Sequence, residues 1–159
     1  MVTISPDMSR KNGFTLVEIM IVVAIIALLA VVALPSFLRA RRQSQNARFV
    51  NALRVASHAI EIYAGEHNAY PPDSNRGIVP PGLATYLDVT LGWTGQTPIG
   101  GQWDWDFNVF GFRAAVSVVG SPADVEQMTE IDSKYDDGDL ATGRFRLTAA
   151  GRYSDIVER

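Results

Sequence analysis

The sequence predicts an α+β fold in which one long N-terminal helix packs on a small antiparallel sheet. Three patterns carry this prediction. Residues 19–34 are sixteen apolar residues without a break. A second segment repeats apolar residues at helical spacing, and a third alternates apolar and polar residues as a half-buried strand does. The length of 159 residues allows one domain plus an additional segment.

The apolar segment is long enough to cross a membrane. From Phe14 to Leu34 it has 21 residues, and a membrane-spanning helix needs about 20. A secretory signal peptide has a shorter apolar core, of roughly 7–15 residues, followed by small residues at a cleavage site. Here Pro35 and several arginines follow instead. We therefore expect the segment to remain in the mature protein.

Two features distinguish this segment from a generic membrane anchor. Gly13 directly precedes the apolar run and follows the basic residues Arg10 and Lys11. Glu18 places a carboxylate inside the run, where an ionisable group costs on the order of a few kcal/mol and usually has a partner or a function. Taken alone, Glu18 is explained equally well by a side chain that reaches the membrane surface from the helix end.

A known signature covers these residues. Residues 11–20 read KNGFTLVEIM, which resembles the prepilin motif of type IV pilins and type II secretion pseudopilins: a short basic leader ending in Gly, then Phe-Thr-Leu-x-Glu and an apolar helix. The resemblance covers roughly the first third of the chain. It implies that a prepilin peptidase cuts after Gly13 and N-methylates Phe14. It also implies that Glu18 neutralises the terminal amine of a neighbouring subunit during assembly.

The same resemblance implies a location and a set of partners. The subunit would be stored as a single-pass protein in the inner (cytoplasmic) membrane, with its head outside the cytoplasm, and would then enter a pilus or pseudopilus filament. Its partners would be further copies of itself, the peptidase, an inner-membrane assembly platform and other minor pilins or pseudopilins. The removed leader would be residues 1–13, with Met8 as an alternative start.

The charges around the span favour the opposite orientation when they are counted alone. Three arginines follow the span, at positions 39, 41 and 42, whereas two basic residues precede it. Basic residues normally mark the cytoplasmic side. The prepilin resemblance is more specific than this count, so we place the head outside the cytoplasm.

A second helical segment follows Pro35, which interrupts helical hydrogen bonding and commonly causes a kink. Its apolar residues recur at spacings of three and four: Phe49, Leu53, Ala56, Ile60 and Tyr63. This stripe is typical of a helix with one buried face. We expect one helix with a membrane or filament-core half over residues 14–38 and an amphipathic half over residues 39–65, ended by Gly65.

The remaining residues, 66–159, are expected to form a globular head. Residues 66–101 are rich in Gly and Pro and predict a loop region, with a short helix over residues 83–87. Antiparallel strands are expected over residues 102–159. A bulge or a turn is expected at Gly111, and a hairpin around residues 150–151.

The strand that begins near residue 103 has an aromatic face. Trp103 and Trp105 alternate with Asp104 and Asp106, which predicts one buried and one solvent face. Aromatic stripes can also bind sugars, but packing against the long helix explains this one better.

A short helix is expected after the strands. Ser121 is expected to cap it, with Pro at the first helical position, and Val125, Met128 and Ile131 mark its buried side. The aspartate-rich residues 132–139 then suggest either a solvated turn or a calcium site, because Ca²⁺ takes several oxygen ligands. We expect no other cofactor.

Composition restricts the classes of function. There is no cysteine, which excludes thiolate metal sites and thiol nucleophiles, and the net charge of −3 does not indicate a nucleic-acid-binding protein. His58 and His67 stand apart from any catalytic pattern, so we expect no enzyme. The sequence therefore predicts a filament subunit, with a membrane-tethered module that binds a metal or a glycan as the alternative.

Overall fold

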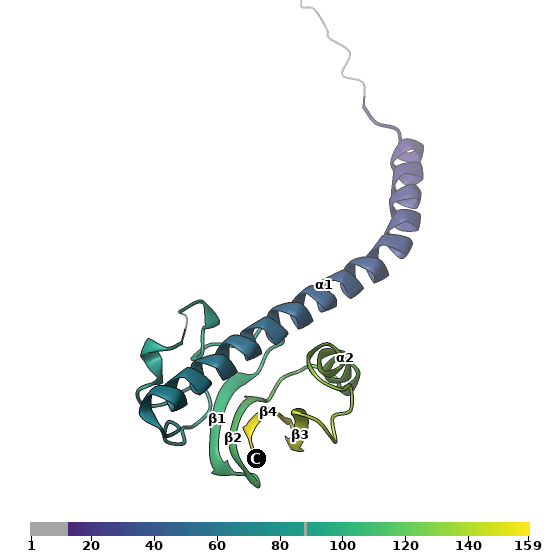
Figure 1. Ribbon diagram of the computed structural model, residues 1–159. Helices are drawn as coiled ribbons and strands as arrows, with labels where there is room; N and C mark the ends of the chain where they lie inside the picture. The colour runs from purple at the N-terminus through teal and green to yellow at the C-terminus, as the bar shows by residue number, and fades with distance from the viewer. Residues whose placement is uncertain (1–12, 88) are drawn as a thin grey trace, which may run out of the picture. The chain divides into compact units, whose positions relative to one another are not determined.

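The computed structural model describes residues 13–87 and 89–159. Residues 1–12 of the expected leader, with the alternative start at Met8, lie outside the described part. The elements are α1 (Leu16–His67), η1 (Leu83–Thr85), η2 (Val89–Leu91), β1 (Gln102–Val109), β2 (Phe112–Val119), α2 (Val125–Tyr135), β3 (Phe145–Ala149) and β4 (Arg152–Glu158) (Figure 1). The fold is α+β with a long N-terminal helix and a small antiparallel sheet, as predicted.

The long helix α1 continues through both Pro35 and Gly65 and ends at His67. Asn68 follows with a φ angle of 51°, which is the left-handed conformation that commonly ends helices. Asparagine adopts this conformation more readily than most residues. The prediction that Gly65 ends the helix is therefore wrong, because Asn68 takes that role.

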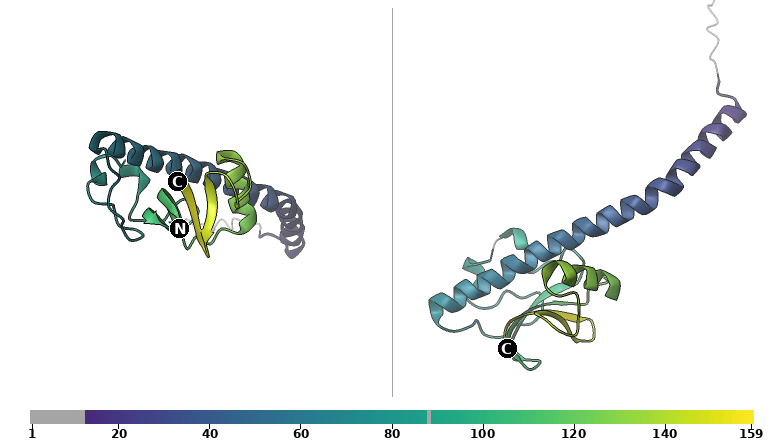
Figure 2. Two further views of the ribbon diagram at one scale, coloured as in Figure 1. Left: turned by 60° about the horizontal axis from the view of Figure 1, so that its bottom comes forward. Right: turned by 45° about the vertical axis from the view of Figure 1, so that its right-hand side comes forward.

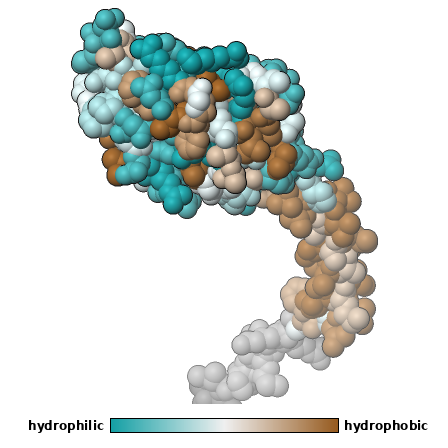
Figure 3. Space-filling view, turned by 90° about the horizontal axis from the view of Figure 1, so that it is seen from below, coloured by the Kyte–Doolittle hydropathy of each residue, from teal (hydrophilic) through white to brown (hydrophobic). Residues whose placement is uncertain are grey.

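The chain divides into two compact units, residues 1–40 and 41–159. In the first unit every described residue is exposed, and the face of this helix seen in Figure 3 is almost wholly hydrophobic. In the described part of the chain, α1 is the helix that is long and apolar enough to cross a membrane, judged by length and composition.

The second unit is built on a four-stranded antiparallel sheet with the order β1-β2-β4-β3. Figure 2 shows this sheet on one side of the second half of α1. The β1–β2 hairpin turns at Phe110 and Gly111, whose φ angles are 55° and 82°. The turn predicted at Gly111 and the hairpin around residues 150–151 are confirmed.

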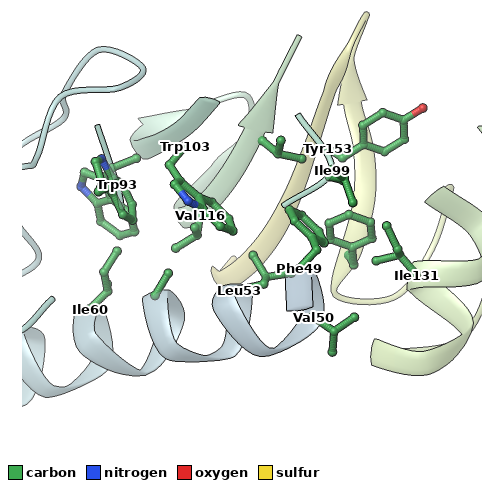
Figure 4. Packing of buried hydrophobic residues seen from close by; sticks show 14 of the residues in the cluster. Phe49, Val50, Leu53, Ile60, Trp93, Ile99, Trp103, Val116, Ile131 and Tyr153 are labelled. Atoms are coloured by element: carbon green, nitrogen blue, oxygen red, sulfur yellow. The ribbon is translucent and has the colours of Figure 1, made fainter. Parts of the chain in front are cut away.

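The core of the second unit lies between α1 and the sheet (Figure 4). The α1 residues Phe49, Leu53, Ala56 and Ile60 are buried, as the stripe predicted. Phe49 stacks on Trp103 with ring centroids 5.4 Å apart. Trp103 and Trp105 are both fully buried. The aromatic face of β1 is therefore core and is not accessible to a sugar.

Two hydrogen bonds join the loop region to β1, and a third links two parts of the loop region to each other. Trp105 donates its Nε1–H to the Pro71 carbonyl at 3.0 Å, and the Phe107 amide donates to the Asp73 carboxylate at 2.9 Å. Trp93 donates to the Ile78 carbonyl at 2.8 Å. The short helix predicted over residues 83–87 is the three-residue 3-10 turn η1.

Two details of α2 differ from the prediction. Asp124 caps the helix by accepting from the Gln127 amide at 2.7 Å, whereas Ser121 donates to the Ile99 carbonyl. Met128 and Ile131 are fully buried, but Val125 is 64% exposed. The buried stripe of α2 consists of Met128, Ile131 and Asp132. Val125 is the first residue of the helix, and its side chain faces outward.

Candidate functional site

The expected processing site precedes α1. Gly13 and Phe14 belong to no helix or strand, and both are exposed. The phenyl ring of Phe14 is 83% exposed, and no atom lies within 4 Å of the position that a Cβ on Gly13 would take. The Gly13–Phe14 peptide bond is thus accessible in the structure.

Glu18 forms a capping box with Thr15 at the start of α1. The Thr15 amide and the Thr15 hydroxyl both donate to Glu18 Oε2 at 2.8 Å, and the Glu18 amide donates back to Thr15 Oγ1 at 3.2 Å. This reciprocal arrangement satisfies backbone N–H groups that have no partner within a helix. The Thr-x-x-Glu spacing was visible in the sequence, and our sequence analysis missed it.

A second candidate site lies where α2 ends. Asp132, Asp136 and Asp137 bring carboxylate oxygens within 4.8 Å of one another. Asp132 is fully buried, and within the described residues neither of its carboxylate oxygens has a hydrogen-bond partner of regular geometry, although the Gly138 backbone and the Asp137 carboxyl lie near. Burial, together with the charges of Asp137 and Asp136, raises the pKa of Asp132 to about 6. We call these three residues the aspartate trio.

Backbone contacts hold the other two members of the trio in place. Asp136 accepts from the amides of Arg144 and Phe145. Asp137 accepts from the Asp139 amide at 2.9 Å and from the Thr142 hydroxyl at 2.9 Å. Asp139, the fourth aspartate of the predicted loop, instead accepts from the Ala141 amide. The segment thus positions three carboxylates of the predicted four.

The acidic face of β1 is covered, although the alternation predicted that it faces solvent. Arg152 donates from Nη1 to Asp106 and from Nη2 to Asp104, each at 2.7 Å. Asp104 and Asp106 are 5% and 3% exposed. Burial raises the pKa of both carboxyls, and the hydrogen bonds from Arg152 and Ser117 oppose that effect. The prediction failed because Arg152 lies on another strand.

A buried aspartate joins three elements of the second unit. Asp155 on β4 accepts from the Ser57 hydroxyl of α1 and from the Tyr135 hydroxyl of α2, the latter at 2.8 Å. Arg144 pairs with it at 2.6 Å. The described donors to Asp155 all belong to the second unit, so this network links α1, α2 and the sheet within that unit.

The two histidines lie outside any catalytic arrangement in the part of the chain that the structure describes. His67 is exposed, stacks on Tyr63 at 4.2 Å and contacts the Tyr63 carbonyl. His58 is exposed and lines a shallow hollow beside Arg54 and Glu61. Within those described residues, neither imidazole hydrogen-bonds a hydroxyl or a carboxylate.

The chain is similar to known proteins over its N-terminal part. Residues 8–34 match the family described as "Prokaryotic N-terminal methylation motif". The chain is 36% identical over 72 residues to the type IV major pilin protein PilA of Myxococcus xanthus, covering 45% of this chain and 33% of that protein. It is 40% identical over 63 residues to the type IV wide pilus major component PilA4 of Thermus thermophilus, covering 40% of this chain and 48% of that protein.

A third relative comes from a secretion system. The type II secretion system core protein G of Aeromonas hydrophila is 29% identical over 62 residues, which cover 39% of this chain and 43% of that protein. The chain thus spans a third to about half of the length of these relatives. No solved structure gives a significant match. The N-terminal segment of this chain carries the prepilin methylation motif, and its homologues over that segment are type IV pilins and type II secretion core protein G.

Proposed function

We propose that this chain is a structural subunit of a type IV pilus or of a type II secretion pseudopilus, and that its role is mechanical rather than enzymatic. The observation that carries the proposal is the first unit of the structure. Its helix is apolar on all sides and fully exposed. Such a surface needs a membrane or other apolar helices around it, and a filament core supplies the latter.

The processing that we propose follows from the motif. A prepilin peptidase cuts after Gly13 and N-methylates Phe14, and the exposure of both residues supports access. Subunits wait in the inner membrane with the head outside the cytoplasm. An assembly platform then adds them to the filament, together with other minor pilins or pseudopilins.

Glu18 has the electrostatic role in this proposal. The free amine of Phe14 has a pKa of about 8 and is charged at neutral pH, and methylation retains the charge. In an apolar core that charge needs a partner, because an unpaired buried charge is strongly destabilising. Glu18 lies just over one helical turn after Phe14, so it can reach the amine of a subunit staggered along the filament axis.

Processing and assembly are tested by Gly13→Leu in a host that provides the peptidase and the assembly platform. We expect the variant to remain in the membrane as uncleaved precursor and to form no filaments, whereas the wild-type chain is cleaved and assembles. Gel mobility and electron microscopy give the two readouts. Normal mature protein from Gly13→Leu would place the cleavage site elsewhere.

A second property is favoured by the aspartate trio. We propose that it holds one Ca²⁺ ion, with backbone carbonyls and water completing the shell of 6–8 oxygen ligands that Ca²⁺ takes. Three carboxylates within 4.8 Å of one another repel. A buried carboxylate without hydrogen bonds of regular geometry is costly unless a cation or a proton compensates it, and Asp132 is such a group.

The calcium proposal is tested with the full chain in detergent. Millimolar CaCl₂ should raise the Tm of the wild-type head, and Asp132→Asn should abolish the increase. Asp139→Asn is the matched control, because Asp139 lies outside the trio, and it should keep the increase. The same Tm with CaCl₂ and with EGTA in the wild type would contradict the calcium site.

A further inference from the structure

Charges of opposite sign are segregated between α1 and the α2 region. Within the second unit, residues 41–60 of α1 contain four arginines and no acidic residue, and Glu61 and Glu66 follow near the helix end. Residues 124–139, which span α2 and the turn after it, contain seven acidic residues and one lysine. Even with one Ca²⁺ at the aspartate trio, the α2 region stays strongly negative. The second unit therefore has an excess of arginine on this part of α1 and an excess of acidic residues around α2.

Some of these opposite charges already form ion pairs within one chain. Arg42 on α1 contacts Asp124 at 3.1 Å and Glu130 at 3.3 Å. Glu126 also pairs with this arginine, at 3.7 Å, while its side chain remains 79% exposed. Farther along α1, Arg48 is exposed and has no acidic partner among the described residues. Glu126 therefore keeps most of its side-chain surface open to a further partner, and Arg48 lies exposed on α1.

Both surfaces also expose apolar side chains beside these charges. On α2, Val125 is 64% exposed next to Glu126. On α1, Val55 is 36% exposed and lines a hollow of about 340 Å³ with Arg48. Leu91 and Pro98 of the loop region form the other wall of this hollow. α2 thus exposes an apolar residue beside an acid, and α1 borders a hollow that contains both an apolar residue and a base.

We infer that the outer face of α2 of one subunit, with Val125 and Glu126, docks into the α1 hollow of the next subunit, beside Arg48 and Val55. The inference rests on the proposed filament and names a contact between its heads. Both surfaces are exposed in the same subunit, so neither covers the other. A contact between two different surfaces of one molecule is heterologous and propagates into an open helical assembly.

The inference is tested by a charge swap in the assembling host. Arg48→Glu and Glu126→Arg should each lower filament yield by about tenfold or more, because each places like charges in contact. The double variant restores opposite charges and should return to within about twofold of the wild-type yield. Arg159→Glu, which reverses an exposed charge at the C-terminus, is the control and should assemble normally.

Crosslinking tests the same contact directly, because the chain contains no cysteine. Val55→Cys with Val125→Cys should give a ladder of crosslinked multimers from filaments treated with a bismaleimide, whereas either single variant should give none. Crosslinked dimers without higher multimers would overturn the α2–α1 contact. Single charge variants that assemble like the wild type would also overturn it, and both outcomes would leave the proposed filament intact. Failure of the processed wild-type chain to assemble would instead overturn the proposed function.

Discussion

Glu18 has two tasks, one shown and one proposed. In the structure it closes a capping box with Thr15, which stabilises the first turn of α1. In the proposed filament it neutralises an amine of a neighbouring subunit. Capping needs a hydrogen-bond acceptor, whereas neutralisation needs a charge. Glutamine accepts hydrogen bonds but carries no charge, so it separates the two tasks.

We predict that Glu18→Gln and Glu18→Val are both processed normally but assemble poorly, with filament yields reduced by about tenfold or more. The valine variant loses cap and charge, and the glutamine variant loses the charge alone. Filament yield by electron microscopy and cleavage by gel mobility check this. Wild-type yield from Glu18→Gln would show that capping is the relevant role.

The raised pKa of Asp132 gives a pH dependence of stability. Its pKa is about 6 in the folded chain and 3.8 as the reference value, so the folded state binds the proton more tightly. Without calcium, stability should fall as pH rises from about 4 to about 6, by up to about 3 kcal/mol, and then level off. Denaturation in EGTA checks this, and Asp132→Asn should remove the decline. An unchanged decline in Asp132→Asn would assign it to another group.

At the scale of elements, the sequence predicted the features that depend on residues close together in the chain. The stripe from Phe49 to Ile60 and the two hairpins were predictable because helical spacing and turn glycines are properties of adjacent residues. The burial of Asp104 was not, because it depends on Arg152, 48 residues later. The helix end was misplaced because both glycine and asparagine readily adopt the left-handed conformation that ends a helix. Asn68 adopts it, whereas Gly65 stays within α1. The capping box was predictable and was overlooked.

The Arg152 pair is expected to matter for the stability of the sheet. Arg152→Met would leave Asp104 and Asp106 buried without their cation, and we predict a loss of about 3–5 kcal/mol. The exposed Arg113–Glu158 pair on the same sheet, at 2.6 Å, is the control, since Arg113→Met should cost about 1 kcal/mol or less. Denaturant unfolding followed by Trp fluorescence checks both. Equal losses would show that Arg152 contributes no more than a surface pair.

At the scale of the whole molecule, the two units differ in how their apolar side chains are covered. The second unit buries its own core, whereas the first exposes an apolar helix that no described residue covers. We predict that the full chain sediments with membranes and is released by detergent but not by high salt, because salt weakens surface charge contacts and leaves apolar insertion intact. Release by salt alone would contradict insertion of the helix.

The central claim is that this chain passes through prepilin processing, and intact mass with N-terminal sequencing of the protein from a membrane fraction tests it most directly. We predict a mature chain of 146 residues that begins with N-methylated Phe14, obtained by removal of residues 1–13 from the 159-residue chain. A chain that begins at Met1 or Met8 with its apolar helix intact would contradict the claim. It would favour a membrane-tethered binding module instead, in which Glu18 only caps its own helix.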